Sequence, residues 1–502
     1  MLTRRKTLLV AAIGVAVTAG TVPFVATADP DDKGTADWGD CADNDVVEET
    51  DPSEVPKAMK CSAIEVPIDW DAPDNTVEVQ ISKLPYTGDG EPKGSVIVVP
   101  GGPGGAGTSD LIGATGTFKN LREHFDVVGF DPRGHWQDKN LPMEDCTENG
   151  PEFAAPKSRE EFDEIHAEQR AAIEKCRSHN PQLFDSFNSL TQAKDLDAVR
   201  EAVGDEKLTA HATSYGGVIA QAYARTFPER VRTLYMDGTV SHDRELPAAE
   251  ERYYAKFEDL FGRFVTWCES NADCALSGED IPDVWQRLIK DADEEPIPVS
   301  ELDGVSYNGH DLQNNVAAFL NYDEKWPDLA RGIVEAREGD ASILAGPSLV
   351  YNGKAFAAPP GVAVECGDGL GYDSYADYEA GRERGKRLSP NFPENRVNRA
   401  MFCIDFDAPV SNPPGPIPGD ELPPILGVAA ANEDHVQDIT DQVPGSRLLR
   451  YEGYGHGLYL KGNQCVIEHA DRYLLDGTLP DEGVSCPKEL SPVHRFIHRG
   501  CG

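Results

Sequence analysis

A serine in this chain has the surroundings that nucleophilic acyl transfer requires. Ser214 stands in "HATSYGG", between a short apolar run and an alanine-rich segment, and Gly216 and Gly217 follow it closely. A serine hydroxyl is a weak nucleophile until a neighbouring base takes its proton. A sharp strand-to-helix turn with small neighbours presents such a serine to its base. The stretch therefore predicts a nucleophile elbow at Ser214.

A base and an acid that could complete this machinery lie late in the chain. His456 occupies the glycine-flanked loop "YEGYGHG", directly after the predicted strand "RLLRY". The preceding predicted strand, in "PILGVAAANEDHV", ends at two carboxylates, Glu433 and Asp434. We expect Asp434 to orient His456, because a short carboxylate suits a loop just past a strand, and Glu433 is the alternative. The order serine, acid, histidine is that of α/β-hydrolases.

Residues 1–28 have the features of a secretory signal peptide. A basic start, Arg4–Lys6, precedes an apolar run at Leu8–Val17, and Ala26–Ala28 resembles a cleavage site. The arginine pair leaves the twin-arginine route open beside the Sec route. We see no later apolar run long enough to span a membrane, so we predict that the mature chain is secreted and has no membrane partner.

The glycine-rich stretch "VVPGGPGGAG" admits two interpretations. Gly102–Gly107 fits G-x-G-x-x-G, a dinucleotide-binding pattern, but Pro103 interrupts it and an exported chain meets little nicotinamide cofactor. Alternatively, glycines after an early strand let the backbone turn its N–H groups towards a developing oxyanion. We favour the second interpretation and expect the N–H groups of Gly102 and Tyr215 to form an oxyanion hole, with no cofactor.

The balance of charge limits the partners. The chain has 46 basic and 87 acidic residues, which gives a formal net charge of −41. Such a surface argues against nucleic acid and anionic membranes as partners. The composition gives no indication of the oligomeric state.

Eleven cysteines indicate disulfides and an oxidising compartment. Neighbours along the chain pair as Cys41–Cys61, Cys146–Cys176, Cys268–Cys274, Cys366–Cys403 and Cys465–Cys486, which leaves Cys501 without a partner. No C-x-x-C pair occurs, and His494 and His498 suit a polar tail better than a metal site, so no metal is expected.

The apolar runs predict an α/β-hydrolase fold, that is, a mostly parallel sheet with a helical cap insertion. Short β-branched runs such as "GSVIVVP" and "FDVVGFD" alternate with helical segments such as "LTQAKDLDAVREAVG". Charged and aromatic helical stretches then replace the strands until a proline-rich linker. We expect a signal peptide at 1–28, an N-terminal leader at 29–60, a first core part at 61–240, a mainly helical cap at 241–414, and a second core part with a disulfide-bearing tail at 415–502.

Taken together, the motifs resemble those of secreted actinobacterial tripeptidyl aminopeptidases, within the proline iminopeptidase-like serine peptidases. The resemblance covers about residues 38–490 and rests on "WGDC", "CSAIEVPIDWDAP", "VVPGGPGGAG", "FDVVGFDPRG", "TSYGGVIAQAYA", "VECGDG", "MFC" and "PGSRLLRYEGYGHG". It implies an α/β-hydrolase fold with a helical cap. It also implies release of short peptides or single residues from the free N-termini of peptide substrates.

The chain departs from the family at three motifs. Ala212 stands where the elbow usually has glycine, "DPRGHWQD" lacks the glycine and serine that usually follow "DPRG", and the acid loop lacks its usual Gly and Thr-Pro. An esterase and a non-catalytic relative with the same fold are therefore the alternatives to a peptidase.

Specificity for a free N-terminus requires a group that neutralises the substrate ammonium, most simply a carboxylate. Two acidic residues of "VECGDG", within the predicted cap, are candidates for this role. They are Glu365 and Asp368.

Overall fold

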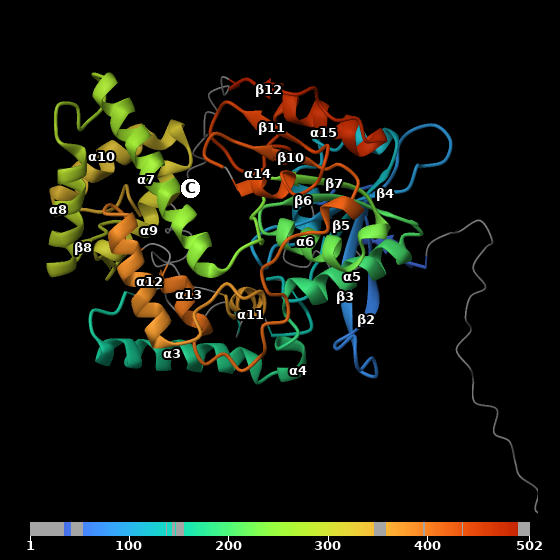
Figure 1. Ribbon diagram of the computed structural model, residues 1–502, viewed down its shortest axis with the longest axis horizontal. Helices are drawn as coiled ribbons and strands as arrows, with labels where there is room; N and C mark the ends of the chain where they lie inside the picture. The colour runs from blue at the N-terminus through green and yellow to red at the C-terminus, as the bar shows by residue number, and fades with distance from the viewer. Residues whose placement is uncertain are drawn as a thin grey trace, which may run out of the picture.

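A ten-stranded sheet lies in the right-hand part of the molecule in Figure 1, beside a group of helices on the left. The computed structural model describes residues 35–41, 54–136, 138–142, 146, 155–345, 358–394, 397–433 and 435–489. The strands lie in the order β1-β2-β3-β5-β4-β6-β7-β10-β11-β12. Their bounds are β1 Gly39–Asp40, β2 Lys60–Pro67, β3 Thr76–Leu84, β4 Ser95–Val99, β5 Asp126–Asp131, β6 Leu208–Thr213, β7 Val231–Asp237, β10 Leu426–Ala429, β11 Arg447–Tyr451 and β12 Ser485–Cys486.

The sheet is antiparallel at one edge and parallel elsewhere. Strands β1, β2, β3 and β5 pair antiparallel, whereas β5, β4, β6, β7, β10, β11 and β12 pair parallel. Every residue of β4, "SVIVV", and of β6, "LTAHAT", is buried, as expected for parallel strands covered on both faces. Because the carboxyl ends of parallel strands meet at one edge, the loops that follow β4, β6, β7, β10 and β11 lie at the same edge of the sheet.

Helices cover both faces of the sheet. Ile97 and Val99 of β4 belong to one buried cluster with α5 and α6, whereas Val96 and Val98 belong to another cluster with α1 and α15. This alternation is the two-residue period of a strand. The helices outside the cap are α1 Gly107–Gly113, α3 Arg159–Arg177, α4 Pro181–Phe184, α5 Ser189–Ala202, α6 Gly216–Thr226, α14 His435–Thr440 and α15 Gln464–Asp476.

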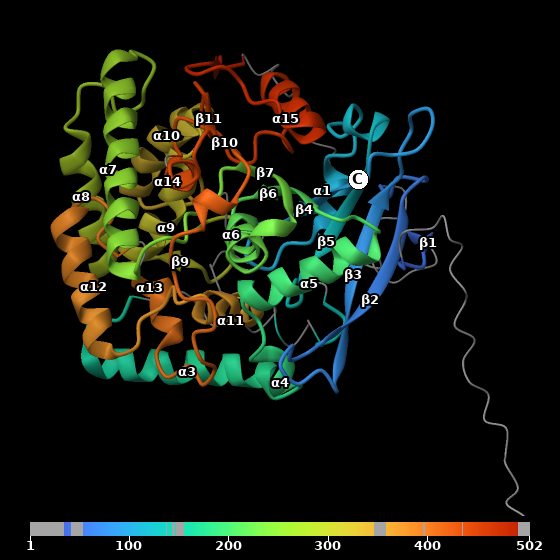
Figure 2. The ribbon, with the colours of Figure 1, turned by 45° about the vertical axis from the view of Figure 1, so that its right-hand side comes forward.

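Between β7 and β10 the chain forms a helical unit beside the sheet, which we call the cap (Figures 1 and 2). Helices α7 to α10 share a hydrophobic core in which Phe264, Trp285, Leu312 and Leu329 are buried. The helices of the cap are α7 Leu246–Ser270, α8 Ile281–Glu294, α9 Gly309–Leu320, α10 Trp326–Arg337, α11 Pro359–Gly367, α12 Tyr375–Leu388 and α13 Val397–Ala400, and its strands are β8 Ile297–Pro298 and β9 Ser306–Tyr307. Helix α3 runs along the lower edge of the molecule in Figure 2.

The predicted cysteine pairing is confirmed. Disulfides join Cys41–Cys61, Cys146–Cys176, Cys268–Cys274, Cys366–Cys403 and Cys465–Cys486, which fits an oxidising compartment. Cys501 and the predicted signal peptide lie outside the described residues. Within the described ranges, no helix is both long and apolar enough to cross a bilayer.

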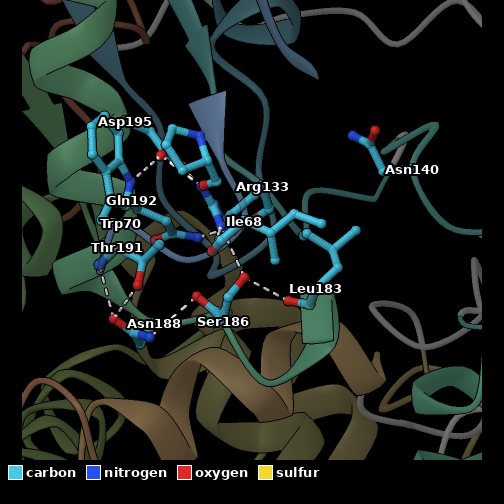
Figure 3. Close-up of polar contacts among 12 residues, drawn as sticks. Ile68, Trp70, Arg133, Asn140, Leu183, Ser186, Asn188, Thr191, Gln192 and Asp195 are labelled. Carbon is cyan, nitrogen blue, oxygen red and sulfur yellow. Dashed lines mark hydrogen bonds and ion pairs between the residues drawn. The ribbon is translucent and has the colours of Figure 1, made fainter. Parts of the chain in front are cut away.

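A buried ion pair fixes the "DPRG" stretch (Figure 3). The Nε and Nη2 groups of Arg133 donate to the Asp195 carboxylate at 2.6 and 2.7 Å. The other guanidinium donors reach the Ser186 hydroxyl at 2.9 Å and the carbonyls of Ile68 and Pro67, both at 2.8 Å. A guanidinium with all of its donors bonded suits a buried ion pair. Arg133 therefore connects the end of β5 to α5 and has a structural role.

Candidate active site

The predicted nucleophile lies on a strained turn between β6 and α6. Ser214 has a φ of 55°, in the left-handed region that residues other than glycine rarely adopt. Its backbone N–H donates to the carbonyl of Asp237 at 3.1 Å, and its carbonyl accepts from Gly217 and Val240 at 3.1 and 3.2 Å. Strain of this kind persists where the surrounding structure imposes it, and it concentrates at functional sites. The side chain of Ser214 is half-buried, as an elbow requires.

The small residues after Ser214 are required by close backbone approach. A Cβ added to Gly216 would lie 2.3 Å from the Val99 carbonyl oxygen, and one added to Gly217 would lie 2.3 Å from the Cβ of Thr239. Both separations are far below van der Waals contact. These glycines therefore let α6 begin directly against the loops after β4 and β7.

His456 is hydrogen-bonded to one of the two carboxylates that the sequence offered. Its Nδ1 lies 2.5 Å from Oε1 of Glu433, the alternative candidate, while Asp434 lies outside the described residues. Glu433 is 7% exposed and sits in a turn after β10, where its N–H donates to the Ala430 carbonyl and its Oε2 accepts from the Ala430 N–H. With Nδ1 donating to Glu433, Nε2 of His456 is left as the basic nitrogen.

The environment of His456 favours its protonated form. Burial of the imidazole opposes protonation, but the hydrogen bond to Glu433 and the charges of Glu433 and Asp237 outweigh it, so the pKa of His456 lies above its usual value. Lys256 of the cap opposes this rise through its positive charge. An imidazole stabilised as a cation is suited to hold a proton during acyl transfer.

Two glycines show that the loops carrying these residues meet. A Cβ added to Gly238, which follows β7, would lie 2.5 Å from Oε1 of Glu433 and 2.9 Å from Nδ1 of His456. A Cβ added to Gly457 would lie 3.2 Å from Cγ2 of Thr213, the residue before Ser214. The histidine loop therefore packs against both the nucleophile turn and the end of β7.

The glycine-rich loop after β4 folds against Ser214. The N–H of Gly105 donates to the Gly101 carbonyl at 3.0 Å, and a Cβ on Gly101 would lie 2.7 Å from that of Ser214. Gly102 has a φ of 121°, which favours glycine. Trp136 belongs to "DPRGHW", one of the stretches in which the chain departs from the family pattern. Its backbone N–H donates to the Gly104 carbonyl at 3.0 Å, and the residue is 52% exposed.

Asp368 is occupied by internal hydrogen bonds. It is fully buried, and its carboxylate accepts from the N–H and hydroxyl of Ser189, the hydroxyl of Tyr215 and the side-chain amide of Asn412, at 2.6–2.9 Å. Burial, together with the charges of Asp368 and Glu365, raises the pKa of Tyr215. Asp368 therefore holds the residue that follows Ser214 and has no oxygen left for a substrate.

Glu365 lies beside Tyr215 as one half of an ion pair. Both of its oxygens lie 2.7 Å from Nε of Arg399, and the residue is 8% exposed. No cluster of three His, Cys, Asp or Glu side chains that could hold a metal ion occurs in the described part of the chain.

Sequence reasoning missed Asn432, which joins both loops to the cap. Its Oδ1 accepts from the Gly455 N–H at 2.9 Å, and its Nδ2 donates to Oδ1 of Asn321, just after α9, at 3.2 Å. Its place directly before Glu433 was the only signal in the sequence. Two further cap contacts reach these loops: Arg263 donates to the Ala431 carbonyl at 3.1 Å, and the Trp326 ring lies 5.2 Å from the Tyr454 ring.

Family comparison agrees with the fold. The family model described as alpha/beta hydrolase fold matches residues 94–353, and the model described as TAP-like protein matches residues 389–486. The chain therefore belongs to the α/β-hydrolase fold family and is a serine hydrolase. This confirms the predicted fold class.

Curated relatives are similar over most of their length. Serine protease Hip1 of Mycobacterium tuberculosis is 29% identical over 470 residues, 86% of this chain and 88% of that protein. Tripeptidyl aminopeptidase of Streptomyces lividans is 26% identical, covering 91% and 87%. Carboxylesterase B of M. tuberculosis is 26% identical, covering 87% and 88%. Among solved structures, proline iminopeptidase of Mycobacterium smegmatis is 13% identical, with a TM-score of 0.35 over 82% of this chain and 97% of that one.

Proposed function

We propose that the protein is a secreted serine exopeptidase that removes short peptides, tripeptides foremost, from the free N-termini of peptide substrates. The observation that carries this proposal is the hydrogen bond between Glu433 and His456, on loops that pack against the Ser214 turn. The relatives named serine protease and tripeptidyl aminopeptidase support the peptidase class. The five disulfides support export.

The reaction proceeds by acyl transfer in two halves. Nε2 of His456 takes the proton of the Ser214 hydroxyl while the Ser214 oxygen attacks the scissile carbonyl carbon. The N–H groups of Gly102 and Tyr215 stabilise the oxyanion of the tetrahedral intermediate. The imidazolium then gives its proton to the leaving amine, and the C–N bond breaks to leave an acyl-enzyme. Water, deprotonated by His456, attacks the ester, and the proton returns to Ser214.

Glu433 is the acid of this scheme, the carboxylate that orients His456. Its charge holds the ring of His456 with Nδ1 protonated and stabilises the imidazolium, without itself accepting the proton. The hydrogen bonds from the Ala430 N–H to Oε2 and from His456 to Oε1 hold both carboxylate oxygens in place.

Of Glu365 and Asp368, Glu365 is the candidate for binding the substrate ammonium. It lies next to Tyr215 and is paired with Arg399, whose guanidinium could release one carboxylate oxygen to an incoming amine. Asp368 supports this site indirectly, through the hydroxyl of Tyr215.

A panel of substrates tests the proposal. We expect turnover of a chromogenic tripeptide with a free amine, at least tenfold slower turnover of its N-blocked form, and none in Ser214→Ala. Ser270→Ala, at an exposed serine on α7, is the matched control and should retain full activity. Residual peptidase activity in Ser214→Ala would refute the assignment of the nucleophile.

An esterase is the second candidate, because the carboxylesterase relative has the same 26% identity to this chain as the aminopeptidase. Short acyl esters belong in the same panel, and turnover of esters without peptides would replace the peptidase by an esterase. Failure of a fluorophosphonate to label Ser214 would show a non-catalytic relative. N-terminal sequencing of the protein from culture medium tests export, with a start after Ala28 expected.

A further inference from the structure

A buried carboxylate besides the proposed catalytic residues Ser214, Glu433 and His456 lies between the nucleophile turn and the histidine loop. Asp237 ends β7, and its backbone carbonyl accepts from the Ser214 N–H at 3.1 Å. Its Oδ2 accepts from the Tyr459 N–H at 2.8 Å and from the Tyr235 hydroxyl at 3.1 Å. One residue thus touches the turn that presents Ser214 and the loop that carries His456.

The two carboxylate oxygens of Asp237 have different surroundings. Asp237 is fully buried, and Oδ1 has no hydrogen-bond partner within the described part of the chain. A buried carboxylate oxygen without a donor costs free energy, so its presence calls for a reason other than packing. The register of β6 and β7 pairs Thr213 with Asp237 and His211 with Tyr235, so all four side chains lie on one face of the sheet.

The charged groups around this carboxylate belong to the proposed active site. Burial raises the pKa of Asp237 to about 6, the N–H groups of Tyr459 and Leu458 lower it, the charge of Glu433 raises it, and that of His456 lowers it. At neutral pH the side chain is therefore an anion that acts on His456.

Three further titratable groups lie around Asp237 and His456: His211, Asp471 and Lys256. His211 on β6 contacts the rings of Tyr235 and Tyr459, and burial lowers its pKa to about 4, so it is neutral. The Tyr459 hydroxyl donates to Asp471 at 2.7 Å, whereas the Tyr459 N–H donates to Asp237. Lys256 of α7 is the cation that acts on His456 from the cap.

We propose that Asp237 is a positioning residue for acyl transfer. Its backbone holds the Ser214 turn, its Oδ2 holds the loop that carries His456, and its negative charge stabilises the imidazolium together with Glu433. This inference rests on the proposed function only in so far as Ser214 and His456 act as nucleophile and base.

The test compares Asp237→Asn with Asp237→Ala and with a matched control, Asp471→Asn. The control also removes a partly buried carboxylate that contacts Tyr459, and burial raises the pKa of Asp471 to about 6 as well. The readout is the pH dependence of fluorophosphonate labelling of Ser214 in the full mature chain, because labelling needs the base and the nucleophile but no particular substrate.

Asp237→Asn keeps an acceptor for Tyr459 and loses only the charge. We expect the acidic limb of its labelling profile to move to lower pH by about half a unit or more, since the imidazolium loses an anion that stabilised it. Asp237→Ala also loses the acceptor, and its maximal labelling rate should fall about tenfold or more. Asp471→Asn should match the wild type in both respects.

If the acidic limb of the labelling profile does not shift in folded Asp237→Asn, or shifts equally in Asp471→Asn, the proposed role of Asp237 is wrong. The proposed active site would not be affected by either result. Absence of labelling in the wild type would overturn the proposed active site instead. Should Asp237→Asn fail to fold, NMR titration of the His456 ring in the wild type decides the matter. Two inflections, the lower one near pH 6, support the coupling, and a single inflection refutes it.

Discussion

His456 and Glu433 are joined by a hydrogen bond of 2.5 Å, although 23 residues separate them and they follow different strands. Their loops come after β11 and β10, which are neighbours in the parallel sheet. Gly238, at the end of the next strand β7, leaves room for the pair, because any Cβ there would overlap both side chains. The pairing of three adjacent strands therefore positions the contact.

Replacing Glu433 separates the two acid candidates. We expect Glu433→Gln to lower kcat/KM about 10³- to 10⁴-fold, because the imidazole loses the carboxylate that fixes its tautomer and stabilises its cation. Asp434→Asn is the matched change at the neighbouring residue, and we expect less than a tenfold loss. Steady-state kinetics on the preferred substrate measure both. A larger loss in Asp434→Asn than in Glu433→Gln would reverse the assignment.

The pH dependence of activity follows from the raised pKa of His456. The base must be neutral to accept a proton, so we expect the acidic limb of kcat/KM above pH 6.5, the usual value for histidine. In Glu433→Gln the limb should move to lower pH. Because the pKa is raised in the folded state, the pair stabilises the fold fully below about pH 6.5, and this contribution is lost as the pH rises through the folded-state value. A wild-type limb below 6.5 would contradict the electrostatic account.

Asn432 is expected to matter more than its partner in the cap. Asn432→Ala removes the acceptor of the Gly455 N–H and also the contact with Asn321. Displacement of the histidine loop should lower kcat about tenfold to a hundredfold. Asn321→Ala removes only the cap contact, so it should cost less than Asn432→Ala. Equal losses of kcat in the two variants would show that the cap contact, and not the hydrogen bond between the loops, supports turnover.

Asp110 offers a test of stability against pH. Burial and the charge of Asp131 raise the pKa of Asp110 to about 7. A carboxyl with a raised folded-state pKa destabilises the fold increasingly as the pH rises from about 4 to that value. We therefore expect Asp110→Asn to melt at a higher temperature than the wild type at pH 8 and to show a smaller gain at pH 5. Thermal melts at both pH values check this, and a gain independent of pH would exclude ionisation as its cause.

The regular part of the fold was predictable because its signals are local. The buried runs of β4 and β6 read directly as central parallel strands, and neighbouring cysteines form the disulfides. The Ser214 turn could be predicted for the same reason, since the glycines that it needs are adjacent in sequence.

The contacts that complete the site are not local, and they were missed or left open. The path of the turn after β10 brings Glu433 to His456. The letters "ANED" alone do not show which of the two adjacent carboxylates this turn directs towards the histidine. Asp237 contacts Tyr459 across 222 residues. Asp368, one of the two candidates for the substrate amine, bonds to Ser189, which is 179 residues away. Side-chain partners at such separations are set by the folded sheet and the cap.

The contacts of Asn321, Arg263 and Trp326 make the cap part of the scaffold that supports the base. Any movement of the cap away from the sheet would break these contacts and free the loop that carries His456. The position of the cap and the position of this loop are therefore linked.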